Sequence, residues 1–160
     1  MSNSEQPGLD ELVRRGGVFS GIPGNAPRDV LTNLVNMIPA PASVNRDRLL
    51  EAVLEREALM STTVGHGLAL PHPRNPLITS PAEQLVTIAF LKEPVDWNAL
   101  DGKPVHTILL IVSASARLHL HTLSRINFFC QREDFRGLLE NRASLEEITG
   151  MIAGAERTWR

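Results

Sequence analysis

The chain has 160 residues, and 16 lysines and arginines against 18 aspartates and glutamates give a formal net charge of −2. This balance argues against non-specific nucleic-acid binding, and 42% hydrophobic with 21% charged residues is typical of a globular protein. No apolar run approaches the ~20 residues that cross a bilayer, and the first residues lack a signal-peptide core. We therefore expect a soluble, cytoplasmic domain whose single cysteine, Cys130, forms no internal disulfide.

The first half of the chain alternates helical spacing with strand-like runs. The predicted segments are, in order, a flexible tail over residues 1–8, a helix over Leu9–Arg15, a strand over Val18–Ile22, a helix over Pro27–Ile38, and a helix from the N-cap Asn45 to Glu57. Residues 61–81 are rich in glycine and proline, so we expect a shaped loop with one short strand near Leu68.

The second half contains two β-rich runs followed by helices. The predicted segments are strands over Leu85–Leu91 and Val105–Val112, helical spacing from Leu120 to Phe129, a short helix around Phe135–Leu139, a helix from the capping box at Ser144 to about Ala153, and a C-terminal tail over residues 155–160. The strand over Val105–Val112 is expected at the centre of the sheet. This order predicts one α/β domain over residues 9–154, a single layered domain with a small mixed β-sheet flanked by helices.

His72 is the histidine with the most constrained backbone, because it lies between Pro71 and Pro73. Pro73 favours extended geometry at His72, so the imidazole has a stiff support. A neutral imidazole is available at physiological pH as a nucleophile, and a stiff support lowers the entropy lost in positioning it. The same spacing also suits a plain surface-loop histidine.

The densest motif is REALMSTTVGHGLALPH over residues 56–72: an Arg-Glu pair, Ser-Thr, a Gly-x-Gly turn, and a small aliphatic run ending in Pro-His. It resembles the enzyme IIA family of the bacterial phosphoenolpyruvate-dependent phosphotransferase system, of the mannitol/fructose type that includes the nitrogen-regulatory branch. Weaker similarity extends from about Leu9 to about Gly154. The resemblance implies the layered α/β fold of that family.

The resemblance also implies roles for particular residues. His72 is expected to accept the phosphoryl group, and Arg56 and His119 to stabilise its oxygens. The Gly65 and Gly67 turn is expected to form a phosphate-binding loop if its backbone N–H groups point inward.

One position departs from the family pattern. Pro73 stands where many relatives have glycine, and it has no N–H to offer a phosphate.

Phosphoryl transfer depends on in-line positioning and fixed positive charge, so no metal and no cofactor is required. The ring nitrogen of His72 opposite the attacking one must keep its proton, and we expect it to donate to a backbone carbonyl or another acceptor.

The implied donor is phosphorylated HPr or its nitrogen-branch counterpart. The implied acceptor is a transporter IIB domain in a sugar-type protein, or a regulated protein that responds to phosphorylation. Because one domain is expected to occupy the 160 residues, we expect no fused IIB, IIC or HPr-like segment, which favours the regulatory branch. Neither a nucleic-acid partner nor membrane insertion is expected.

Two alternatives remain at this point. The pair His119-x-His121 would bind zinc with His72 or His66 if a strand placed both side chains on one face, whereas a helix would separate them. Apolar spacing over residues 120–126 favours the helix. The second alternative is a binding module that retains the fold without transferring phosphate.

Overall fold

The computed structural model describes residues 7–159 of the chain. The tail predicted over residues 1–8 therefore falls largely outside the described residues. The elements are, in chain order, α1 (Leu9–Gly16), β1 (Val18–Ile22), α2 (Pro27–Met37), α3 (Arg46–Leu59), β2 (Thr63–Gly65), β3 (Leu68–Ala69), η2 (Pro81–Glu83), β4 (Leu85–Val95), β5 (Val105–Val112), α4 (Ala116–Cys130), α5 (Glu133–Glu140), α6 (Leu145–Glu156) and η3 (Arg157–Trp159).

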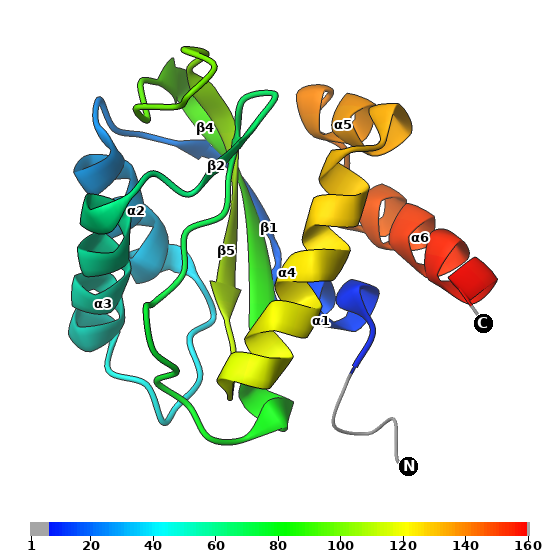
Figure 1. Ribbon diagram of the computed structural model, residues 1–160, viewed down its shortest axis with the longest axis horizontal. Helices are drawn as coiled ribbons and strands as arrows, with labels where there is room; N and C mark the ends of the chain where they lie inside the picture. The colour runs from blue at the N-terminus through cyan, green and yellow to red at the C-terminus, as the bar shows by residue number, and fades with distance from the viewer. Residues whose placement is uncertain (1–6, 160) are drawn as a thin grey trace.

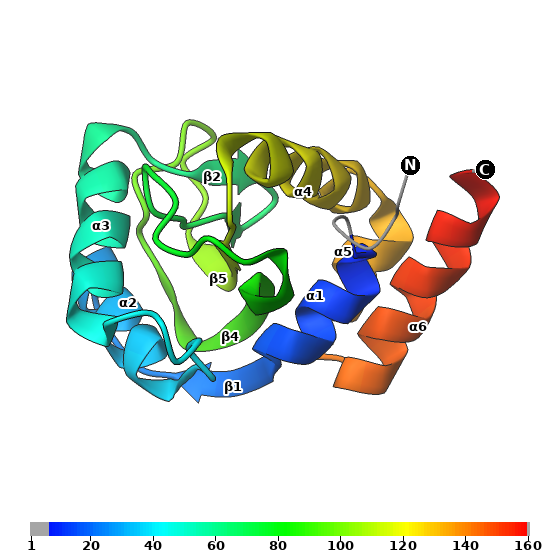
Figure 2. The same cartoon turned by 90° about the horizontal axis from the view of Figure 1, so that it is seen from below.

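The strands form one mixed sheet in the order β1-β4-β5-β3-β2. β1 pairs with β4 in parallel and β4 with β5 antiparallel, while β3 is parallel to β5 and antiparallel to β2. β5 lies at the centre of the order, as its apolar run predicted. Helices α2 and α3 cover one face of this sheet, and α1, α4, α5 and α6 cover the other (Figures 1 and 2). The predicted layered α/β domain is confirmed.

The alternation of side chains along β4 explains why helices cover both faces of the sheet. Val86, Ile88 and Phe90 pack into the cluster with α1, α4, α5 and α6. Leu85, Ala89 and Leu91 pack into the opposite cluster with α2 and α3. Because successive side chains of a strand point to opposite faces, an entirely apolar strand needs helices on both sides.

The C-terminal end differs from the prediction. Residues 155–159 of the expected tail over residues 155–160 are instead helical, since α6 runs to Glu156 and continues as η3 to Trp159. Residue 160 lies outside the described residues. The carboxylate of Glu156 accepts a hydrogen bond from the Leu9 N–H at 3.2 Å and pairs with Arg125. These long-range contacts stabilise the last turn, and no local spacing encodes them.

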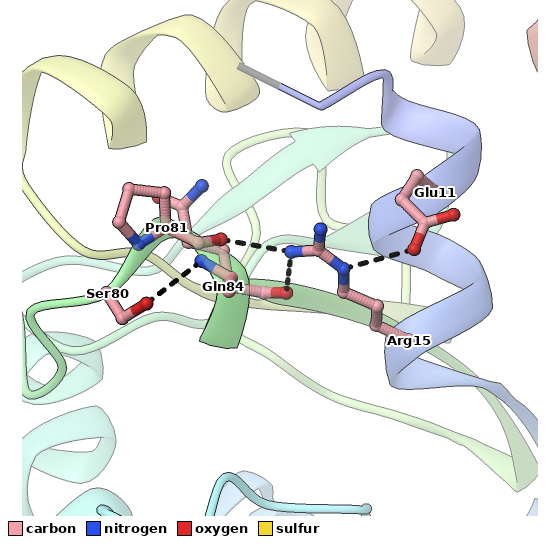
Figure 3. Close-up of polar contacts among 6 residues, drawn as sticks. Glu11, Arg15, Ser80, Pro81 and Gln84 are labelled. Carbon is pink, nitrogen blue, oxygen red and sulfur yellow. Dashed lines mark hydrogen bonds and ion pairs between the residues drawn. The ribbon is translucent and has the colours of Figure 1, made fainter. Parts of the chain in front are cut away.

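Arg15 connects α1 to the loop that precedes β4, as Figure 3 shows. Its Nη1 donates to the carbonyl oxygens of Pro81 and Gln84 at 3.0 and 3.2 Å, and its Nε donates to Glu11. The buried side chain of Gln84 in turn accepts from the Ala114 N–H at 2.9 Å. Helix α1 is thereby linked to the segment that leads into α4.

No helix in the described part of the chain has both the length and the apolar character needed to cross a bilayer.

The close approach of α1 to β4 depends on Gly16. A Cβ atom on Gly16 would lie 2.0 Å from the Val86 carbonyl oxygen, a backbone atom that cannot rotate away. We predict that Gly16→Ala lowers the free energy of unfolding by about 3 kcal/mol or more, because the helix must move off the sheet. Urea unfolding of the purified variant measures this loss.

Gly150→Ala on α6 is the matched control, because nothing lies within 4 Å of a Cβ there. This variant should gain about 0.5–1 kcal/mol from the reduced entropy of its unfolded chain. Equal stability of the two variants would contradict the packing argument.

Candidate functional site

The position of His72 follows from its neighbours in the sheet. β3 is parallel to β5, and the chain stays beside β5 after β3 ends, because the Ile111 N–H donates to the Pro71 carbonyl at 3.0 Å. His72 therefore emerges at the carboxyl end of β5, the end from which the chain continues into α4. Helices α3 and α4 lie on opposite sides of the sheet at this point (Figure 2).

The ring of His72 is fixed by one hydrogen bond. Its Nδ1 lies 2.7 Å from the carbonyl oxygen of Leu70. A carbonyl can only accept, so Nδ1 carries the proton and Nε2 keeps its lone pair. This is the backbone acceptor that the sequence led us to expect. The half-buried ring thus has Nε2 as its free nucleophilic atom.

His119 lies beside His72, in the first turn of α4. The two ring centroids are 4.5 Å apart and the planes are tilted by 44°. Ser115 caps this helix, with its hydroxyl accepting from the Leu118 N–H. The positive end of the helix dipole therefore lies next to the histidine pair and favours an anion there.

Arg56 supplies the fixed positive charge. It lies in the last turn of α3, and its Nη1 donates to the Met60 carbonyl at 2.8 Å. Its charge lowers the pKa of both His72 and His119, so all three side chains share one electrostatic environment. The structure thus brings together the three residues that the motifs singled out.

Burial controls the charge state of the two rings. It is the main cause of the lowered pKa of His72; Arg56 adds to the lowering, while the Leu70 carbonyl and Glu57 oppose it. Burial, His72 and Arg56 together lower the pKa of His119 to about 4. Both imidazoles are therefore neutral at neutral pH, one with a nucleophilic nitrogen and the other with a single N–H to donate.

Glu57 and Thr62 belong to the support of the site, although their roles were not predicted. The Glu57 carboxylate accepts from the N–H and the hydroxyl of Thr62, both at 2.8 Å. The hydroxyl of the neighbouring Ser61 donates to the Trp97 carbonyl at 2.8 Å. These bonds fix the turn between α3 and β2 and so hold the end of α3 that carries Arg56. The Arg-Glu and Ser-Thr pairs of the motif were the sequence signal for this turn.

The turn that holds the two glycines predicted to bind phosphate lies near the start of β5, whereas His72 lies near its end. The Gly67 carbonyl accepts from the His106 and Thr107 N–H groups, near the start of β5, whereas Pro71 pairs with Ile111 near its end. Three residues, Leu68 to Leu70, lie between Gly67 and Pro71, and the four steps of extended chain from one to the other span about 13 Å. Gly65 ends β2 and Gly67 lies in the turn before β3, and the phosphate-binding role of these glycines stays a prediction. A Cβ on Gly67 would come within 2.4 Å of the His106 ring.

The other histidines lie apart from this pair. His66 is exposed at the β2–β3 turn, and the Nδ1 of His106 is 2.8 Å from the Thr107 hydroxyl. His121 accepts from the Arg125 Nε at 2.9 Å. No group of three or more histidine, cysteine, aspartate or glutamate side chains is arranged to hold a metal ion within residues 7–159.

A cavity of about 290 Å³ opens beside His119. Its walls are formed by the loop after His72, the end of β5 and the start of α4, namely Pro73, Arg74, Asn75, Pro76, Ile111, Ser113, Ala116, His119 and Leu120. A ligand or a side chain of a partner protein can therefore approach His119 through this cavity.

Comparison with known proteins identifies the family. Residues 12–154 match the family described as "Phosphoenolpyruvate-dependent sugar phosphotransferase system, EIIA 2", and the chain belongs to it. The resemblance seen in the motif over residues 56–72 is confirmed. The IIA components of this system are phosphotransfer proteins, and membership of the family supports a phosphotransfer role for this chain.

Two curated relatives show the range of the family. The fructose-specific EIIABC component of Bacillus subtilis is 29% identical over 147 residues, which cover 90% of this chain and 23% of that protein. The chain thus spans less than a quarter of the Bacillus protein. The nitrogen regulatory protein of Pseudomonas aeruginosa is 28% identical over 151 residues, 92% of this chain and 96% of that protein.

Solved structures show the same fold. The nitrogen regulatory protein IIA-Ntr from Neisseria meningitidis matches with a TM-score of 0.77 and 24% identity, covering 90% of this chain and 98% of that one. The IIA-Mtl protein of Escherichia coli, solved in complex with phosphorylated IIB-Mtl, matches with a TM-score of 0.62 and 18% identity over 86% of this chain and 94% of that one.

The lowered pKa of His119 predicts a pH-dependent stability. An unfolded histidine takes up its proton near pH 6.5, whereas native His119 does so near pH 4, so the unfolded chain binds more protons between these values. The free energy of unfolding should therefore fall as the pH drops from 6.5 toward 4. Urea unfolding across this range should show a smaller fall for His119→Gln. The same pH dependence in both proteins would contradict the assignment.

Proposed function

We propose that the protein is a cytoplasmic histidine phosphocarrier of the phosphoenolpyruvate-dependent phosphotransferase system, which accepts a phosphoryl group on Nε2 of His72. The donor is a phosphorylated histidine on HPr or its nitrogen-branch counterpart. One observation carries the proposal: the Leu70 carbonyl holds the proton on Nδ1, so the nitrogen with a free lone pair is Nε2, beside His119 and near Arg56.

The reaction exchanges one phosphorus–nitrogen bond for another. Nε2 of His72 attacks the phosphorus as the bond to the donor imidazole breaks, and the electron pair of that bond returns to the donor ring. The ring of His72 gains positive charge as the new bond forms. The Leu70 carbonyl stabilises this charge through the proton on Nδ1.

Arg56 and His119 act on the phosphoryl oxygens. Negative charge spreads over three oxygens in the transition state, and preorganised donors lower its energy. Arg56 uses one Nη1 bond on the Met60 carbonyl and has further N–H groups to direct at these oxygens. His119, neutral by virtue of its low pKa, contributes one N–H.

The step after His72 has two forms with the same chemistry. Similarity to proteins named nitrogen regulatory protein supports a regulatory role, in which partners respond to the phosphorylation state. Similarity to the IIA-Mtl protein solved with phosphorylated IIB-Mtl supports transfer to a IIB domain. Loss of the phosphoryl group on mixing with a IIB domain separates the second role from the first.

The proposal predicts one labelled residue. Wild-type protein incubated with phosphoenolpyruvate, enzyme I and HPr should gain one acid-labile phosphoryl group in its intact mass, and His72→Ala should gain none. His121→Ala is the matched control, because His121 contacts Arg125 rather than the site, and should label like wild type. Equal labelling of wild type and His72→Ala would show that another residue accepts the group. No labelling of wild type, with donors shown to be active, would favour a binding module without transfer chemistry.

The role of Arg56 predicts a kinetic defect. Arg56→Lys keeps the charge but loses the planar fork that binds two oxygens, so the transfer rate should fall about tenfold or more. Rapid-quench measurement of phosphoryl transfer from phosphorylated HPr provides the rate. Arg48→Lys, at an exposed position of the same helix, should leave it unchanged. An unchanged rate in Arg56→Lys would remove Arg56 from the site.

A further inference from the structure

Ser113 is a buried polar residue for which the motifs suggested no role. It directly follows β5 and is 7% exposed. Its hydroxyl lies 3.4 Å from Nδ1 of His119 and has no other hydrogen-bonding partner among the described residues. Hydrogen bonds in catalytic sites are often long in the unliganded protein and shorten when the reacting group binds.

The segment around Ser113 is held on both sides. The Ala114 N–H donates to the side chain of Gln84, which is 2% exposed. The Ser115 hydroxyl caps α4, and the His119 N–H donates to the Ser115 carbonyl at 2.9 Å. The hydroxyl of Ser113 and the ring of His119 are therefore set against each other by backbone contacts that do not involve either side chain.

A neutral imidazole has one N–H, and its position decides what His119 can do. With the proton on Nδ1, the ring would turn the lone pair of Nε2 toward phosphoryl oxygens and repel them. With the proton on Nε2, the ring donates a hydrogen bond to them. The low pKa of His119 keeps the ring from carrying both protons at neutral pH.

We infer that Ser113 is a positioning residue whose hydroxyl donates to Nδ1 of His119 and so holds the proton of that ring on Nε2. The inference rests on the proposed function, because it names the residue that prepares His119 for phosphoryl transfer. It also assigns opposite states to the two rings. A carbonyl, which only accepts, keeps Nε2 of His72 bare, whereas a hydroxyl that donates keeps Nε2 of His119 protonated.

The test uses the whole, unphosphorylated protein labelled with ¹⁵N. Long-range ¹⁵N–¹H spectra assign the protonated nitrogen of each histidine from its chemical shifts. In wild type, His119 should be protonated on Nε2 and His72 on Nδ1. In Ser113→Ala, His119 should become a mixture of both tautomers while His72 stays unchanged, which also shows that the site remains folded. Ser113→Thr retains the hydroxyl and should restore the wild-type spectrum.

Transfer rates provide the second measurement. Ser113→Ala should accept the phosphoryl group about tenfold more slowly than wild type, and Ser113→Thr should recover most of that loss. His119 protonated on Nδ1 in wild type, or an unchanged tautomer in Ser113→Ala, would overturn the inference. Because the spectra need no phosphoryl donor, wild-type protein that fails to label would overturn the proposed function alone, and the tautomers would still decide the role of Ser113.

Discussion

The hydrogen bond from Nδ1 of His72 to the Leu70 carbonyl is the contact on which the proposed chemistry of the site depends. The chain runs beside β5 from Leu68 to Pro71, and the Leu70 carbonyl of this segment is presented to the ring two residues later. Moving this segment along β5 by one residue would reverse the faces of its side chains. The pairing with β5 therefore sets the face on which the ring lies, and the local bond to the Leu70 carbonyl leaves Nε2 as the nitrogen with a free lone pair.

The site combines a permanent cation with two neutral rings. Among the described residues no acidic side chain forms a salt bridge with Arg56, and the neighbouring carboxylate of Glu57 is bound to Thr62 instead. The positive charge of Arg56 therefore stays available for an anion. Burial keeps His72 and His119 neutral, so the site gains its selectivity for an anion without losing its nucleophile.

Support for the site comes from distant parts of the chain. Arg15 on α1 binds the loop before β4, and Gln84 in that loop binds the backbone next to Ser113. The carboxyl end of β5, where the candidate site lies, is thus connected to both α1 and the start of α4. Such connections restrict the motion of this end of the sheet, and the proposed phosphoryl transfer would benefit from the fixed geometry.

The amino-acid sequence by itself determined the strand over residues 105–112, the helices capped by Asn45 and Ser144, and the strand over residues 85–95 as far as Leu91, because local periodicity and capping residues encode these features. A dense motif also singled out His72, Arg56 and His119, which the structure brings together. It did not predict the order of the strands, the position of Gly67 near the start of β5, or the contact of Ser113 with His119. Only the tertiary structure decided these, since periodicity specifies which face of an element is buried, whereas strand pairing and side-chain partners depend on contacts between residues far apart in the chain.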